Sequence, residues 1–172
     1  MRLKIIRSFT VPFSSMRSVK GFTLMEVLMV VVIISLIAAF AMPSYLEQVA
    51  RGRRAEAKSF LLDLASRQER YYTQYSSYSP QIAKVPSCSN DTCYLGFETS
   101  LSPDGHYTGK VEALPSSCSP TGTLCTGYIL VAEAIGSDKK CPVLTLDNAG
   151  AKGAKDESDT ALSGAALDYC WR

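Results

Sequence analysis

Glu26 is the one charged residue in a long apolar segment that runs from Phe22 to Met42. A carboxylate near the hydrocarbon of a membrane costs on the order of 2.5 kcal/mol or more, so it usually has a partner or a function. An ordinary membrane anchor does not need it. A secretory signal peptide does not explain it either, because its apolar region is shorter and its cleavage site follows that region. Glu26 is therefore the first candidate for a functional residue.

The six cysteines form the second group of residues that could do chemistry. All of them lie after residue 87, and an even number is typical of a disulfide framework in an oxidising compartment. Their spacing favours Cys88–Cys93 and Cys118–Cys125 as short loops and Cys141–Cys170 as a long one, among many pairings that are possible in principle. A zinc site is the alternative, but His106 is the only histidine and no Cys-x-x-Cys occurs.

An enzyme is not expected from the remaining polar residues. No Ser, His and Asp set or Cys and His set is available around His106, and no Gly-rich phosphate loop follows a predicted strand. The sequence therefore predicts neither catalytic residues nor a cofactor nor a metal site.

The charge balance argues against a general electrostatic attraction to nucleic acid. Residues 1–21 hold five basic residues and no acid, and without them 13 basic residues face 16 acidic ones, a net charge of −3. From Thr73 onward 7 basic and 11 acidic residues give about −4. Candidate DNA contacts are confined to four lysines, for which solvated loop charges are the favoured interpretation: Lys139, Lys140, Lys152 and Lys155.

Four zones of the chain would position these residues. Residues 1–21 form a basic leader, residues 22–42 an apolar helix, residues 43–75 an amphipathic helix and residues 76–172 a cysteine-bearing head. The apolar zone would span roughly 30 Å as a helix, the hydrocarbon thickness of a bilayer. The basic flank is expected to stay cytoplasmic, which places the head on the other side of the membrane.

The zone from 43 to 75 continues the helix, with Pro43 expected to kink it. Its predicted apolar face recurs at three- and four-residue steps: Ala57, Leu61, Leu64, Ala65, Gln68, Tyr72 and Tyr75. Its arginines and lysine are predicted to occupy the opposite, solvated surface: Arg51, Arg53, Arg54, Lys58, Arg67 and Arg70.

The head is predicted to contain short strands separated by turns. They are expected at Tyr94–Phe97, Tyr107–Ala113, Tyr128–Ala134 and Pro142–Leu146, with a loop from Gly150 to Gly164 closed by Cys141 and Cys170. An antiparallel sheet packed on the amphipathic helix would bury both apolar faces. The predicted fold is α+β, a long N-terminal helix on a disulfide-bonded sheet.

The stretch Gly21-Phe22-Thr23-Leu24-Met25-Glu26-Val27, followed by the apolar run and Pro43, resembles the type IV prepilin signature. The resemblance implies cleavage after Gly21 by a prepilin peptidase, which also N-methylates the new N-terminal Phe22. Glu26 and Pro43 then become the fifth and twenty-second residues of the mature chain. The resemblance further implies that the Glu26 carboxylate pairs with an N-terminal amine during filament assembly, where a low dielectric strengthens the attraction.

Two features depart from the usual pattern of this family. The leader of 21 residues is long, and Met16 would begin one of ordinary length, so both Met1 and Met16 remain candidate starts. Ser35 also stands where the family commonly has glycine.

The stretch Arg67-Gln68-Glu69-Arg70-Tyr71-Tyr72 is similar to PilE-like minor pilins, as are residues 141–152 and Cys170-Trp171. This resemblance implies a minor type IV pilus subunit that supports pilus biogenesis, adhesion, twitching motility or DNA uptake. A ComP-like DNA-uptake receptor and a type II secretion pseudopilin are the alternatives.

The implied partners are other pilins, the peptidase and N-methyltransferase, the inner-membrane assembly machinery and the lipid bilayer, with DNA not favoured. The implied location is the inner membrane of a Gram-negative bacterium, with the head in the periplasm, and then the extracellular pilus.

Overall fold

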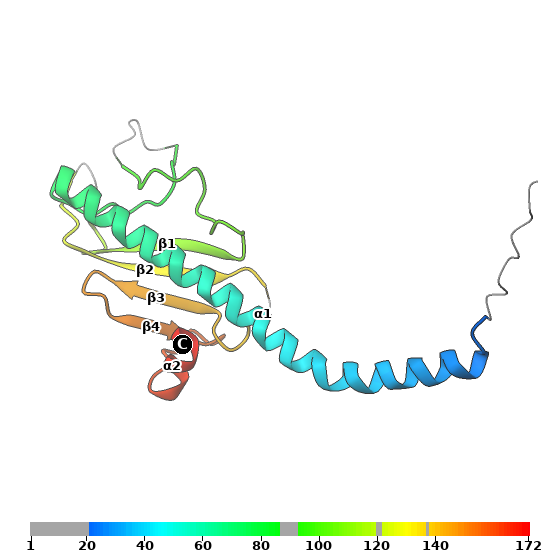
Figure 1. Cartoon of the computed structure of the whole chain (residues 1–172). Coiled ribbons are helices and arrows are strands. Elements are labelled where there is room, and N and C mark those ends of the chain that lie inside the picture. Colours follow the sequence, from blue (N-terminus) through cyan, green and yellow to red (C-terminus); the bar gives the residue numbers. More distant parts are fainter. Residues whose placement is uncertain (1–20, 87–92, 120–121, 137) are drawn as a thin grey trace, which may run out of the picture. The chain divides into compact units, whose positions relative to one another are not determined.

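The computed structural model describes residues 21–86, 93–119, 122–136 and 138–172. The chain divides into two compact units, with the boundary between Pro43 and Ser44. One continuous helix, α1 (Leu24–Tyr75), contributes its first part to one unit and its second part to the other (Figure 1). Pro43 lies inside this helix, as the last residue of the first unit.

In the first unit, no other described segment covers the apolar part of α1. Phe22 and Phe40 are each 82 % exposed, and every residue from 21 to 43 is exposed. Within the described part of the chain, α1 is the one helix long and apolar enough, by length and composition, to cross a membrane. None of the most apolar stretch of α1 is buried. A helix apolar on all faces is expected to be covered by lipid or by other helices.

In the second unit, α1 is followed by a four-stranded antiparallel sheet and a short helix. The strands are β1 (Tyr107–Leu114), β2 (Gly127–Ala134), β3 (Val143–Asp147) and β4 (Lys152–Lys155), in the spatial order β1-β2-β3-β4. Helix α2 (Ala165–Trp171) ends the chain. Each strand pairs antiparallel with the next one along the chain. The predicted α+β fold, with a long N-terminal helix on an antiparallel disulfide-bonded sheet, is confirmed.

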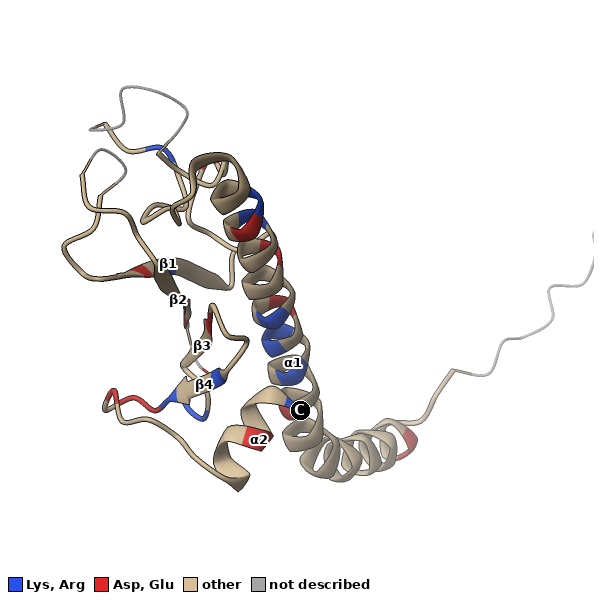
Figure 2. Cartoon of the chain, turned by 90° about the vertical axis from the view of Figure 1, so that its left-hand side faces the viewer, with Lys and Arg blue, Asp and Glu red and all other residues tan. Residues whose placement is uncertain are grey.

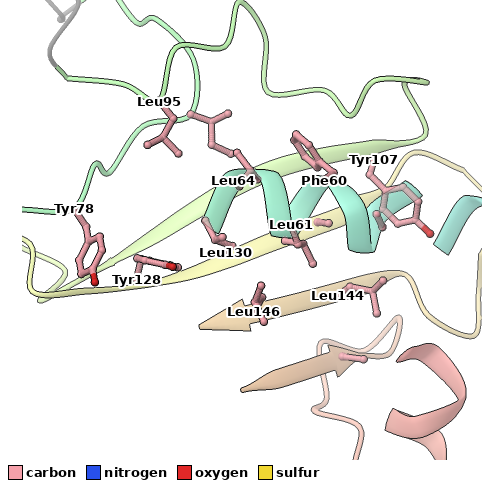
Figure 3. Packing of buried hydrophobic residues seen from close by; sticks show 14 of the residues in the cluster. Phe60, Leu61, Leu64, Tyr78, Leu95, Tyr107, Tyr128, Leu130, Leu144 and Leu146 are labelled. Atoms are coloured by element: carbon pink, nitrogen blue, oxygen red, sulfur yellow. The ribbon is translucent and has the colours of Figure 1, made fainter. Parts of the chain in front are cut away.

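The core lies between one face of α1 and the inner face of the sheet (Figure 3). From the helix come Ala57, Phe60, Leu61, Leu64 and Tyr71, and from the strands Tyr107, Tyr128, Leu130, Leu144 and Leu146. The helical residues recur at steps of three and four, as a buried stripe requires.

This stripe differs from the predicted one at its edges. Phe60 and Tyr71 belong to the core although the predicted stripe omits them, whereas Tyr72 and Tyr75 are each 42 % exposed. Gln68 is fully buried, and its side-chain amide exchanges two hydrogen bonds with the backbone of Ser79, at 2.7 and 2.9 Å. The segment that leaves the helix supplies these partners, so its path decides which side of the helix is covered.

Two predictions about the head are wrong. Tyr94–Phe97 is not a strand: it forms one isolated bridge, between Ala83 and Phe97, and Gly96 adopts a φ of +82° that interrupts extended backbone. The predicted loop from Gly150 to Gly164 contains strand β4, which pairs with β3. The Lys-Gly-Ala-Lys sequence of β4 has little strand propensity, so tertiary pairing rather than local preference makes it a strand.

Two predicted disulfides are present in the head. Cys118 bonds to Cys125 with a Cα–Cα distance of 5.1 Å, and Cys141 bonds to Cys170 with 5.7 Å. The predicted pair Cys88–Cys93 involves a residue outside the described part of the chain. The bond from Cys141 to Cys170 ties α2 to the turn before β3 and thereby fixes the C-terminal end of the chain.

Candidate functional site

The N-terminal end of α1 carries the residues of the predicted processing segment. Gly21 and Phe22 precede the helix and are exposed. The backbone N–H of Glu26 donates to the Thr23 side-chain hydroxyl at 3.2 Å and to the Thr23 carbonyl at 3.1 Å. Thr23 therefore caps the helix, and Thr-x-x-Glu is the sequence pattern of a capping box. This second role of the motif could have been read from the sequence.

Glu26 lies in the first turn of α1, where the aligned peptide dipoles favour a negative charge. Its side chain is exposed, and among the described residues none forms an ion pair with it. The carboxylate is therefore held near the helix start and is open to a cation supplied from outside this helix.

The four lysines predicted as DNA contacts are mostly engaged locally. Lys140 lies 3.4 Å from the Glu47 carboxylate and donates to the Tyr169 hydroxyl at 3.3 Å. Lys155 pairs with Asp159 at 2.9 Å, and the ammonium of Lys152 lies 5.3 Å from the centre of the Trp171 ring. Lys139 is exposed. These contacts hold α2 and the loop after β4, which supports the alternative of structural loop charges.

Arg54 is buried with 2 % of its surface exposed, so its predicted place on the solvated surface is wrong. Its Nε donates to Asp138 at 2.7 Å, and Nη2 contacts Glu47 at 3.5 Å and the Tyr169 hydroxyl at 3.3 Å. Tyr169 also donates to Glu47. A buried guanidinium is tolerated because these partners balance its charge and satisfy its donors.

Glu56 forms a second polar cluster, on another part of α1. Its carboxylate accepts hydrogen bonds from the Ser102 hydroxyl and from the backbone N–H of Asp104 at 3.0 Å, and it contacts His106 Nδ1 at 2.8 Å. Glu56 thus anchors the turn before β1 to the helix. The side chains of Glu56, Asp104 and His106 bring ligand atoms within 4.8 Å of one another, an arrangement that could hold a metal ion. The hydrogen bonds of Glu56 to Asp104 and His106 already explain why these three side chains lie close together.

The pKa of Glu56 is below its ordinary value. Burial favours the neutral carboxyl, but the hydrogen bonds from Ser102, His106 and Asp104 together outweigh burial and favour the charged form. A depressed folded-state pKa stabilises the fold above the unfolded-state pKa, about 4.3, and this contribution is lost as the pH falls through the lower folded-state value.

We therefore expect Glu56→Gln to lower the midpoint of chemical denaturation at pH 7, with a smaller deficit at pH 3. The measurement is denaturation of the full chain in detergent micelles at both pH values. Asp104→Asn is the matched control, because Asp104 contacts Glu56 through its backbone N–H and should change little. An equal deficit at the two pH values would contradict the ionised role of Glu56.

A pocket of about 260 Å³ lies at the C-terminal end of α1, beside the segment from Tyr94 to Gly96. Two arginines, three tyrosines and one glutamine dominate its lining, completed by Leu95 and Gly96: Arg67, Arg70, Tyr71, Gln74, Tyr75 and Tyr94. We call it the tyrosine pocket. Three of its residues come from the Arg67–Tyr72 stretch, whose cationic and aromatic composition was visible in the sequence, whereas the contribution of Tyr94 to Gly96 was not.

Two family models match the chain. The model "Prokaryotic N-terminal methylation motif" matches residues 16–42, and the model "Type IV minor pilin ComP, DNA uptake sequence receptor" matches residues 43–145. The second match covers more than half of the chain.

Several curated relatives match part of the chain. The type IV major pilin protein PilA of Myxococcus xanthus is 35 % identical over 74 residues, which cover 41 % of this chain and 34 % of that protein. The type IV major fimbrial protein FimA of Dichelobacter nodosus is 52 % identical over 40 residues, covering 23 % and 25 %. The type IV wide pilus major component PilA4 of Thermus thermophilus is 36 % identical over 72 residues, covering 42 % and 55 %.

Among solved structures, a type IV pilin from Shewanella oneidensis is similar with a TM-score of 0.40 and 18 % identity. The similarity covers 67 % of this chain and 99 % of that one. The match spans about a third of the length of PilA from Myxococcus xanthus and a quarter of the length of FimA from Dichelobacter nodosus. The ComP family model, in contrast, covers the second part of α1 and most of the head. On that match, the chain belongs to the type IV minor pilin ComP family.

Proposed function

We propose that this chain is a minor subunit of a type IV pilus whose head binds duplex DNA for uptake. The observation that carries the DNA-binding part is the match of residues 43–145 to a family described as a DNA uptake sequence receptor. This match favours the ComP-like alternative over a secretion pseudopilin.

The same proposal covers processing and assembly. A prepilin peptidase would cleave between Gly21 and Phe22, and Phe22 would be N-methylated, in line with the match to the methylation motif. The exposed position of both residues ahead of the helix suits a protease substrate. The apolar part of α1 would anchor the subunit in the inner membrane with its head in the periplasm, and would then pack among other pilins in the filament. Pilus assembly machinery of a Gram-negative inner membrane would carry out that transfer.

DNA binding can be tested with the full chain in detergent micelles and a fluorescently labelled duplex. We expect binding at low salt, with the logarithm of the affinity falling linearly with the logarithm of salt concentration by about 0.9 per phosphate contact. Heparin, an unrelated polyanion, is the control for general charge attraction. Absence of binding at low salt would contradict the DNA role and leave the pilus role standing.

A further inference from the structure

The tyrosine pocket has the chemistry of a phosphate-and-sugar contact. Arginine, tyrosine and glutamine side chains, together with backbone N–H groups, are the groups that proteins use to hold the backbone of DNA. Arg70, Gln74 and Tyr75 supply three of these side-chain types from successive turns at the end of α1. One helix end thus presents a cation, an amide and a phenol to the same hollow.

The two arginines of the pocket have different surroundings. Arg67 pairs with Asp63 at 3.2 Å, donates to the Leu95 carbonyl at 3.3 Å and lies 4.0 Å from the centre of the Phe97 ring. Arg67 is therefore committed to the wall of the pocket. Arg70 is exposed, and among the described residues its guanidinium has neither an ion pair nor a hydrogen bond. It is the cation that remains available to a ligand.

The aromatic residues shape the rest of the pocket. The rings of Tyr71 and Tyr75 lie 4.6 Å apart, with Tyr71 buried and Tyr75 42 % exposed. Gly96 also lines the pocket, and its φ of +82° is a backbone conformation that favours glycine. The ring of Tyr75 thus lies beside a buried aromatic neighbour and keeps part of its surface exposed.

The charge pattern of the head favours this place over the lysine-bearing loops. Figure 2 shows basic segments recurring along α1 among acidic ones. Lys140, Lys152 and Lys155 are each engaged with an acid or an aromatic ring, as described above. Arg70 combines exposure, absence of a described acidic partner and a position on a pocket.

We propose that the tyrosine pocket is where the head contacts the DNA backbone, with Arg70 pairing with a phosphate. This inference rests on the proposed DNA-binding function and assigns it a place. It differs from the sequence prediction, which had placed the basic contacts on Lys139, Lys140, Lys152 and Lys155.

The test compares the binding of a labelled duplex by full-length variants in detergent micelles over a range of salt concentrations. Arg70→Ala is expected to weaken binding by about fivefold, as for one exposed ion pair, and to reduce the salt slope by about 0.9. Arg70→Lys keeps the charge and should retain the slope. Arg51→Ala is the matched control, because it removes the same charge from an exposed position of α1 and should have little effect.

The outcomes separate the two proposals. If the unaltered chain does not bind DNA, the DNA-binding part of the proposed function fails and this site fails with it. If the unaltered chain binds and Arg70→Ala binds equally well, the DNA role stands and the pocket is excluded. Loss of binding in Lys139→Ala, with Arg70→Ala unaffected, would place the DNA contact at Lys139 and contradict the pocket site. An equal loss in Arg51→Ala and Arg70→Ala would show general charge attraction and overturn the site.

Discussion

Replacing Glu26 by alanine is expected to abolish or strongly reduce incorporation of the subunit into pili while cleavage after Gly21 continues. In the proposed filament, the cationic amine of the processed Phe22 is surrounded by apolar helices and needs a carboxylate partner. Removal of one member of a charge pair from a low-dielectric site leaves the other uncompensated, at a cost of about 3–5 kcal/mol. That cost would shift assembly by more than a hundredfold.

The measurement is the ratio of sheared surface pili to total cellular subunit, with mass spectrometry to confirm cleavage and methylation. Glu26→Gln removes the charge at nearly constant shape and should resemble Glu26→Ala. Thr23→Ala is the matched control: it removes the hydroxyl that caps α1 and keeps the carboxylate. Its effect should be limited to about 1 kcal/mol of helix stability. Normal incorporation of Glu26→Ala would contradict the pairing role.

Arg54→Met is expected to lower the free energy of unfolding of the head by about 3–5 kcal/mol, because it leaves a buried Asp138 without its cation. The side chains of Arg54 and Asp138 are only 2 % and 7 % exposed, and their 2.7 Å contact joins α1 to the segment before β3. Trp171, the only tryptophan, donates to the Gly153 carbonyl at 2.8 Å and can report unfolding by its fluorescence.

The double variant Arg54→Met with Asp138→Asn provides the control. Asparagine keeps the oxygen that accepts a hydrogen bond from the Cys141 N–H at 3.3 Å, but it carries no charge. We expect the double variant to be more stable than Arg54→Met alone, since no buried charge is left uncompensated. If the two variants were equally unstable, loss of packing would account for the effect in place of charge.

The sequence alone determined the apolar segment from Phe22 to Met42 and its helix. A run of apolar residues is a local property that holds whatever the rest of the chain does, and so is the position of Glu26 within it. The positions of Gly21, Phe22 and Pro43, which carry the resemblance to prepilins, are local properties of the sequence in the same way. The disulfide Cys118–Cys125 could be predicted from the sequence for a related reason. The two cysteines are separated by only seven residues, so they lie close together in any compact head.

Only the tertiary structure decided the features that depend on partners distant in sequence. Arg54 looks solvated in its helix, and it is buried because Asp138, 84 residues further along the chain, balances its charge. Lys152–Lys155 looks like a loop, and it is a strand because β3 offers it an edge. The tyrosine pocket exists only because the segment from Tyr94 to Gly96 lies beside the C-terminal end of α1. In each case burial or pairing outweighs local preference, since those free energies depend on which segments meet.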